Sequence, residues 1–240
     1  MQTKCDRRES WSRLDASTLH RAVIWLGYQT GLIGGLRGDM SVSIVWIGVG
    51  AGLLLLGLLL VNLRYRHFGM WPVADPAGWK SWLFWSLFRT ANVSALTLAA
   101  VDWQPGVLQS PERMVSAITA ARLGLAYLRS CMTLGSGNLY CGRHGLNCSG
   151  IYRLSRNPQY ATAIAAYALL VVASSAAGML PIVIILIAVY SLMARNEEPW
   201  LSEAYGAAYQ EYVAEVPRFF GMRSLIGLVG ANSPSQRRHR

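Results

Sequence analysis

The chain is poor in charged residues, which make up only 14% of its 240 residues. A soluble globular domain carries about 25% charged residues. Hydrophobic residues make up 53% of the chain, so the composition favours a membrane-embedded protein over a soluble enzyme. The net charge is +10, but the basic residues are spread between apolar runs and form no single stripe. We therefore predict no nucleic-acid partner and explain the charge by membrane topology.

Cysteine is scarce too, and the four copies form no C-x2-C pair. Cys131 lies in an apolar run, where a buried free thiol is expected. Cys141, His144 and Cys148 form C-x2-H-x3-C, which could be one corner of a metal site. A closed zinc site needs a fourth ligand and usually a second paired motif. We therefore predict no metal.

The sequence has no recognisable cleavable targeting segment, because its first twenty residues are polar and its first long apolar run begins too late. That run, Ile44 to Val61, is long enough to span a membrane. Gly48 and Gly52 within it form a small-x3-small pattern that predicts close helix packing. Six spans can be drawn: 22–36, 43–63, 81–101, 114–134, 160–177 and 180–194. We predict an all-α, polytopic transmembrane helical bundle.

The distribution of lysine and arginine predicts the orientation of these spans. Seventeen of these residues fall on segments assigned to one side, and only Arg37 and Arg113 fall on the other. The positive-inside rule places the rich side, with both chain termini, in the cytoplasm. An arrangement of five spans with an interfacial N-terminal helix is the alternative. Either arrangement predicts a multi-pass protein of a cell inner membrane or an endomembrane.

Two polar blocks lie at the feet of the last apolar hairpin, whose turn is bracketed by Gly178 and Pro181. The first block is Gly150 to Tyr160, and the second begins at Arg195 and closes with Pro217-Arg218-Phe219. Arginines, paired carboxylates and tyrosines at both feet of a membrane hairpin predict a polar functional site at the membrane surface.

The order of these motifs resembles the isoprenylcysteine carboxyl methyltransferases and the related phospholipid methyltransferases. The resemblance rests on Gly150-Ile151-Tyr152, Arg156-Asn157-Pro158-Gln159-Tyr160, the hairpin, Glu197-Glu198, Tyr205-Gly206-Ala207-Ala208-Tyr209-Gln210-Glu211-Tyr212 and Pro217-Arg218-Phe219. It covers roughly residues 135 to 220. It divides the chain into N-terminal transmembrane helices (1–134), a methyltransferase-like catalytic region (135–223) and a basic tail (224–240) that we expect to be disordered.

The resemblance implies an integral membrane methyltransferase that uses S-adenosyl-L-methionine in a cytoplasmic pocket. The residues that it places at the cofactor are His144, Leu146, Asn147, Tyr152, Asn157, Pro158, Tyr160 and Glu197. It implies that Arg195 or Arg218 faces the acceptor as a catalytic residue. The family's histidine is Asn157 here, which can still donate and accept hydrogen bonds but cannot take up a proton. We expect Asn157 to serve if that residue only holds the cofactor.

Structural roles compete with these assignments. Asn157-Pro158 is a typical helix N-terminus, with asparagine as cap and proline in the first turn. Glu197-Glu198 could cap a last helix beginning at Pro199, and the spaced tyrosines could form an interfacial aromatic belt. Arg153 and Arg156 could be topology charges alone.

The predicted partners are a lipophilic small molecule or lipid as substrate, and membrane lipids; no protein partner is predicted. The acceptor could be an isoprenylcysteine-like carboxylate, a phospholipid amine or a thiol. Two other functions stay open. One is a reductase of the sterol-reductase type that uses NADPH, against which the short chain and the paired glutamates argue. The other is a non-catalytic, lipid-binding membrane protein.

Overall fold

A computed structural model describes residues 16–73, 75–103, 106, 110–139 and 145–221, with side chains described from residue 38 onward except 136–139. The chain divides into two compact units, residues 1–42 and 43–240. The helical residues of the first unit are the N-terminal part of the first long helix. All sites discussed below lie in the second unit.

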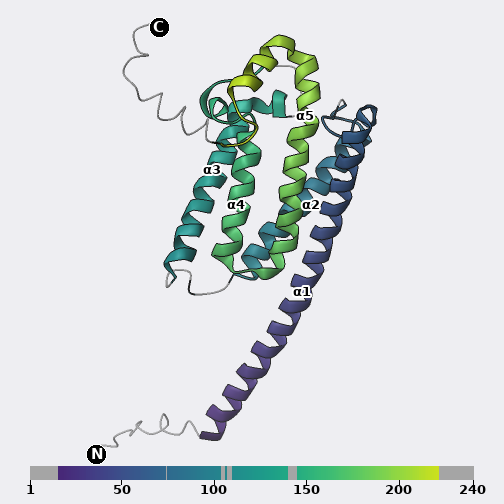
Figure 1. The fold of residues 1–240 in the computed structure, drawn as a ribbon. Helices are drawn as coiled ribbons and strands as arrows, with labels where there is room; N and C mark the ends of the chain where they lie inside the picture. Colours follow the sequence, from purple (N-terminus) through teal and green to yellow (C-terminus); the bar gives the residue numbers. More distant parts are fainter. Residues whose placement is uncertain (1–15, 74, 104–105, 107–109, 140–144, 222–240) are drawn as a thin grey trace, which may run out of the picture. The chain divides into compact units, whose positions relative to one another are not determined.

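The described residues form helices and no strand, which confirms the predicted all-α class (Figure 1). The elements are α1 (Ala16–Arg64), η1 (Arg66–Phe68), α2 (Trp79–Val101), α3 (Pro111–Leu139), η3 (Gly150–Arg153), α4 (Pro158–Ser174), η4 (Ala177–Met179) and α5 (Leu180–Glu215). The predicted hairpin is formed by α4 and α5, and Pro181 lies in the first turn of α5, where its missing N–H costs nothing.

The first two predicted spans belong to one helix. α1 runs through residues 37–42 without a break, so the predicted loop carrying Arg37 is wrong. No helix-breaking proline lies between the two segments, which explains their continuity. Two described helices, Gly38–Arg64 and Ala177–Glu215, are long and apolar enough to cross a membrane, and α4 is a shorter apolar helix. The number of spans beyond these two remains a prediction.

Glycines allow α1 to approach α2 and α5 closely. A Cβ atom on Gly48 would lie 2.5 Å from Ile182 Cδ1 and 2.7 Å from Ser94 Cβ. A Cβ atom on Gly52 would lie 2.8 Å from Ile185 Cγ2. These contacts confirm that the small-x3-small pattern is a packing motif. The opposite face of α1 is apolar and exposed, with Trp46 70% accessible, as expected of a face that meets lipid.

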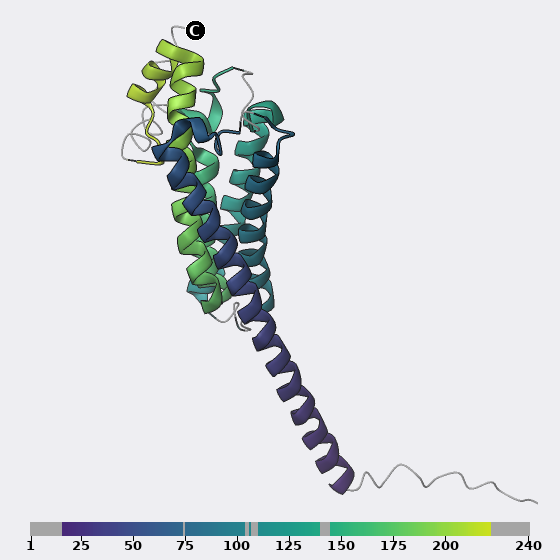
Figure 2. The same ribbon diagram turned by 90° about the vertical axis from the view of Figure 1, so that its right-hand side faces the viewer.

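The other helices of the second unit pack together, with α3 along α4, and with α2, α4 and α5 in contact with one another (Figures 1 and 2). The core of the second unit includes Leu59, Phe84, Leu98, Met179 and Leu186, all at most 1% exposed. The two polar blocks lie at the N-terminal end of α4 and in the C-terminal part of α5.

A glycine breaks α5 near its C-terminal end. Gly206 has φ +53° and ψ −128°, a backbone conformation that residues with a Cβ atom rarely adopt. The last turns of α5 change direction here (Figure 1). Glu197 and Glu198 lie inside α5, ahead of this break, and Pro199 is also inside the helix. The alternative in which Glu197 and Glu198 cap a last helix beginning at Pro199 is therefore wrong.

Candidate functional site

A cavity lies where the connector before α4 meets α5 and the loop between α1 and α2. The connector contributes its turn and the first residues of α4, and α5 contributes residues on both sides of its break. The lining residues are Trp71, Pro72, Leu134, Gly145, Leu146, Asn147, Tyr152, Arg156, Asn157, Gln159, Tyr160, Glu197, Trp200, Leu201, Tyr205, Tyr209 and Tyr212. The lining combines aromatic rings with one carboxylate and one guanidinium, a composition typical of sites for polar organic ligands.

Glu197 is the carboxylate of this cavity, and two side chains fix one of its oxygens. Trp71 Nε1 donates a hydrogen bond to Glu197 Oε1 at 2.9 Å, and the Tyr160 hydroxyl donates to the same oxygen. No hydrogen bond from a described residue reaches Oε2. One carboxylate oxygen is thus held by the protein while the other is left for a hydroxyl or ammonium group of a ligand.

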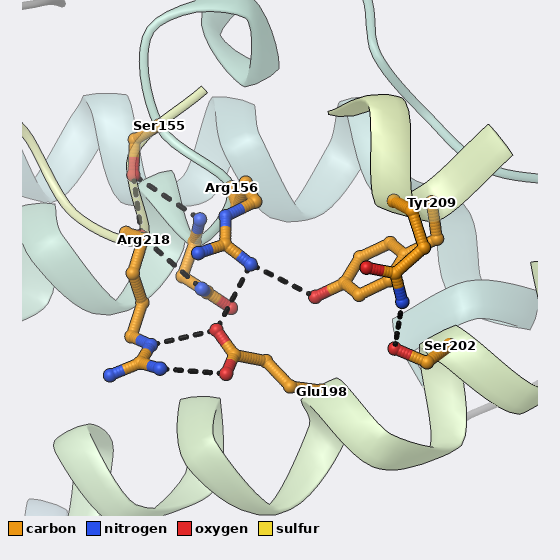
Figure 3. A network of polar contacts seen from close by, with 8 residues as sticks. Ser155, Arg156, Glu198, Ser202, Tyr209 and Arg218 are labelled. Carbon is orange, nitrogen blue, oxygen red and sulfur yellow. Dashed lines mark hydrogen bonds and ion pairs between the residues drawn. The ribbon is translucent and has the colours of Figure 1, made fainter. Parts of the chain in front are cut away.

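Glu198, the next residue, belongs to a separate network (Figure 3). Its two oxygens accept hydrogen bonds from Arg218 Nε and NH2, each at 2.7 Å. Its Oε1 also lies 3.0 Å from Arg156 NH1. Such a bidentate arginine–carboxylate pair is among the stronger side-chain interactions. The hydrogen bond to Glu198 raises the pKa of Arg218 above its usual value.

Arg156 connects this network to the cavity. Its side chain is only 10% exposed, and NH1 donates to the Tyr209 hydroxyl at 3.2 Å as well as to Glu198. Its Nε atom is buried and has no hydrogen-bond partner among the described residues. A buried unpaired donor is costly, and more so on a charged group. Arg156 and Arg218 share the single carboxylate of Glu198, so one positive charge is left over. An anionic group of a ligand near Arg156 would balance that charge.

The C-terminal segment pairs with the connector through the backbone. Arg156 N donates to Pro217 O at 2.9 Å, and Asn157 N donates to Arg218 O at 3.2 Å. The hydroxyl of Ser155 and the amide Nδ2 of Asn157 also donate to Arg218 O, each at 3.2 Å. The Asn157 side chain therefore makes no cap hydrogen bond to α4, and that part of the prediction is wrong. Pro158 begins α4 as predicted.

Tyrosines tie the connector to the helices around it. Tyr152, 3% exposed, donates from its hydroxyl to Gln159 Oε1 at 3.1 Å or to Ser130 O at 3.3 Å. Burial raises the pKa of Tyr152, so its phenol stays neutral. Tyr212 donates to Tyr152 O at 2.6 Å. Tyr209 and Tyr212 are buried, so they face the cavity and form no interfacial aromatic belt.

The structure brings together most of the residues predicted at the cofactor. Leu146, Asn147, Tyr152, Asn157, Tyr160 and Glu197 all line the cavity. Asn147 also holds the connector to α3, because its Nδ2 donates to Thr133 O at 2.8 Å. Pro158 is buried at the start of α4 and is not part of the lining. His144 and Cys141 lie outside the described residues, so the cofactor role of His144 and the metal corner stay untested.

The two arginines predicted at the acceptor are not among the described residues that line this cavity. Arg195 is exposed, and it is absent from the described lining. Arg218 is paired with Glu198 and holds the C-terminal segment. The guanidinium in the cavity belongs to Arg156. From the sequence, this residue was considered only as a charge that sets membrane topology. Trp71 was missed altogether, because a tryptophan in a loop outside the motifs carries no sequence signal.

A second, apolar cavity lies beside the first, between α2, α3 and α4. Its lining includes Phe88, Leu96, Leu125, Leu128, Ala163 and Leu170, with Tyr190 from α5. Asn92 is a polar exception, and its Oδ1 accepts hydrogen bonds from Tyr167 at 2.7 Å and Tyr190 at 2.8 Å. The rings of Tyr190 and Tyr160 lie 5.7 Å apart, so this tyrosine pair links the apolar cavity to the polar one.

Comparison with known proteins agrees with the motifs. Residues 113–208 match the family model described as phospholipid methyltransferase. The match spans α3, the connector, the hairpin and the glutamate pair, and it confirms the resemblance that these motifs indicated. It ends before Arg218 and begins after Trp71. No curated protein and no solved structure matched the chain.

Proposed function

We propose that this chain, which carries the phospholipid methyltransferase family pattern in residues 113–208, is an integral membrane methyltransferase that uses S-adenosylmethionine. The observation that carries the proposal is one aromatic cavity lined by Glu197, whose Oε2 accepts no hydrogen bond from a described residue, and by the guanidinium of Arg156, which Glu198 and Tyr209 hold in place. S-adenosylmethionine has a carboxylate for such a donor, and hydroxyl and ammonium groups for such an acceptor. When bound, it supplies a methyl group carried on a sulfonium.

The residues of the cavity have separable tasks in this proposal. Arg156 attracts an anionic group of the ligand, while Glu198 and Tyr209 keep the guanidinium in place. Glu197 accepts a hydrogen bond through Oε2. The aromatic rings of Trp200 and Tyr205 offer faces that attract a cationic sulfonium. Methyl transfer is a direct displacement, so these residues act by alignment and by excluding water.

The acceptor in this proposal is lipophilic: an isoprenylcysteine-like carboxylate, a phospholipid amine or a thiol. Its apolar part lies in the cavity between α2, α3 and α4, and its reactive group passes the Tyr160–Tyr190 pair to reach the polar cavity. The Asn157 amide donates a hydrogen bond to the C-terminal segment and cannot act as a base. We therefore do not assign to it the removal of a proton from the acceptor. A carboxylate or thiolate acceptor needs no base.

The membrane arrangement completes the proposal. Two helices long and apolar enough to cross a membrane support an integral protein. The lysines and arginines of the connector and of the C-terminal region support a multi-pass topology with the polar cavity on the cytoplasmic side. The predicted placement of both termini on that side depended on a loop at residues 37–42, where α1 is continuous. S-adenosylmethionine is made on that side.

Titration calorimetry of the purified, full-length protein tests the cofactor. Wild-type protein should bind S-adenosylhomocysteine saturably, and NADPH should neither bind nor compete. Glu197→Gln should weaken this binding about tenfold or more, because a charged acceptor is lost. Arg195→Gln is the matched control on the same helix and should bind like wild type, since Arg195 is exposed. Wild-type protein that binds neither compound would refute the methyltransferase, and binding of NADPH alone would favour the reductase.

A further inference from the structure

We propose that Trp71 is a positioning residue for Glu197, supplied by a loop outside the family-matched segment. Trp71 lies between α1 and α2, more than forty residues before the matched segment begins at residue 113. The inference rests on the proposed function, because it assigns Trp71 a role in binding the methyl donor. Three sets of contacts carry it: those that hold the loop, those that orient the indole, and the one that reaches Glu197.

A pair of buried asparagines holds the loop against α5. Asn62, 4% exposed, accepts a hydrogen bond from Met70 N at 2.8 Å, and its Nδ2 donates to Trp71 O at 2.6 Å. The same Nδ2 donates to Asn196 Oδ1 at 2.9 Å. Asn196 directly precedes Glu197, so the loop is tied to α5 beside the carboxylate. Buried amide groups need hydrogen-bond partners. The bonds of Asn62 meet this need and also hold residues 70 and 71 next to α5.

The indole of Trp71 has little freedom to turn. It is 3% exposed and stacks on the Phe84 ring, with centroids 4.4 Å apart and planes 12° apart. The ring of Trp85 meets it edge-on at 5.9 Å. Aromatic pairs in these geometries add stability beyond the area that they bury. The ring orientation is therefore set by α2, which directs the indole N–H toward α5.

The indole N–H ends on the oxygen that Tyr160 also binds. Trp71 and Tyr160 both donate to Oε1 of Glu197, from two different parts of the chain. Two donors on one oxygen fix the rotation of the carboxylate group, and no described residue donates to Oε2. Trp71 therefore presents Oε2 of Glu197 to the ligand. It acts through Glu197, and its own ring forms part of the cavity wall.

The test compares full-length variants by titration with S-adenosylhomocysteine. Trp71→Phe keeps an aromatic ring against Phe84 and removes the N–H, so affinity should fall about fivefold to tenfold. Trp79→Phe is the matched control, since Trp79 is 64% exposed and is absent from the described lining; it should bind like wild type. A merely structural role for Trp71 is separated by a double-mutant cycle with Glu197→Met, which removes both side-chain oxygens. In that background, Trp71→Phe should change affinity less than twofold, because the acceptor of its N–H is gone.

Each outcome bears on one claim. If wild-type protein does not bind S-adenosylhomocysteine, the proposed function fails before Trp71 is considered. If wild type binds and Trp71→Phe binds equally well, the positioning role is overturned. It is also overturned if Trp71→Phe lowers affinity by the same factor with and without Glu197. If Trp71→Phe does not fold, benzothienylalanine incorporated at position 71 keeps the shape of the indole and lacks its N–H, and the same comparisons apply.

Discussion

Glu198 and Arg218 form a two-pronged ion pair that links α5 to the C-terminal segment, with both N–O distances at 2.7 Å. The pair joins two stretches that are twenty residues apart in sequence. Because the backbone of the same segment also bonds to the connector at Arg156 and Asn157, the ion pair closes a ring of contacts around one side of the cavity. Its partner on the connector, Arg156, uses the same carboxylate.

Replacing Glu198 by glutamine should destabilise the protein. The variant leaves two guanidinium groups together without their shared carboxylate, and because Arg218 is one-third exposed we expect a loss of about 2 kcal/mol rather than the larger cost of a fully buried pair. Thermal unfolding in detergent should show a lower midpoint. Glu203→Gln, an exposed change on the same helix, is the control and should leave the midpoint unchanged. Equal midpoints for the two variants would contradict the role of the network.

Adding a methyl group to Gly48 should loosen the contact between α1 and its neighbours. Gly48→Ala places Cβ within 2.7 Å of Ser94 Cβ, which cannot move without the backbone of α2, so we expect a loss of about 1–3 kcal/mol. Gly50→Ala is a control two residues away, since nothing lies within 4 Å of its added Cβ. The control should match or exceed wild-type stability, because alanine favours helix. Thermal unfolding that ranks the two variants the other way would show that the glycine pattern is not a packing motif.

Part of this cavity was predictable because its residues lie in motifs whose order along the chain resembles that of a known family. Tyr152, Asn157, Tyr160 and Glu197 were named from these motifs, and all four line the cavity. Helix positions were predictable from long apolar runs. The continuity of the first two predicted spans was not predictable, because composition alone cannot distinguish two short helices from one long one.

The partners of each polar group were not predictable, because they depend on how distant segments pack. Arg156 and Arg218 look alike in the sequence, and only the fold decides which one lines the cavity. Asn157 resembled a helix cap, but the return of the C-terminal segment offered its amide another acceptor. Trp71 enters the site through contacts with Asn62 and Phe84, neither of which belongs to a motif.

Removing the Tyr212 hydroxyl should weaken the attachment of the last turns of α5 to the connector. Tyr212→Phe loses a buried hydrogen bond and leaves the Tyr152 carbonyl without that donor, so we expect a loss of about 1–2 kcal/mol. Tyr205→Phe is the control, since the Tyr205 hydroxyl has no hydrogen bond in the described structure and its ring packs on Trp200 alone among aromatic neighbours. Proteolysis at a low protease concentration should cleave Tyr212→Phe faster near the C-terminus. Equal cleavage rates would argue that this hydroxyl does not anchor the helix.

Filling the apolar cavity should separate acceptor use from cofactor binding. Gly124 lines the cavity, and nothing lies within 4 Å of an added Cβ, so Gly124→Phe can extend a ring into the space. Transfer of labelled methyl from S-adenosylmethionine to lipid-extractable material should fall about tenfold, because an occupied cavity excludes the apolar part of the acceptor. S-adenosylhomocysteine affinity should stay the same.

The control for this experiment is Gly57→Phe, another open glycine position on α1 that is absent from the described cavity lining. It should retain both methyl transfer and cofactor affinity. Unchanged methyl transfer in Gly124→Phe would show that the acceptor does not bind in the apolar cavity. Loss of S-adenosylhomocysteine binding in that variant would instead indicate that the two cavities are not separate.

Glu197 and Glu198 are adjacent, yet they serve different partners, and the reason is the angular step of the helix. Successive residues of an α-helix point about 100° apart, so one carboxylate turns to Trp71 and Tyr160 while the other turns to the two arginines. The rotational phase of α5 is therefore fixed from two directions at once. One residue inserted into α5 ahead of this doublet would rotate both carboxylates together, so the site tolerates sequence change in the lipid-facing positions of α5 far better than any change in its length.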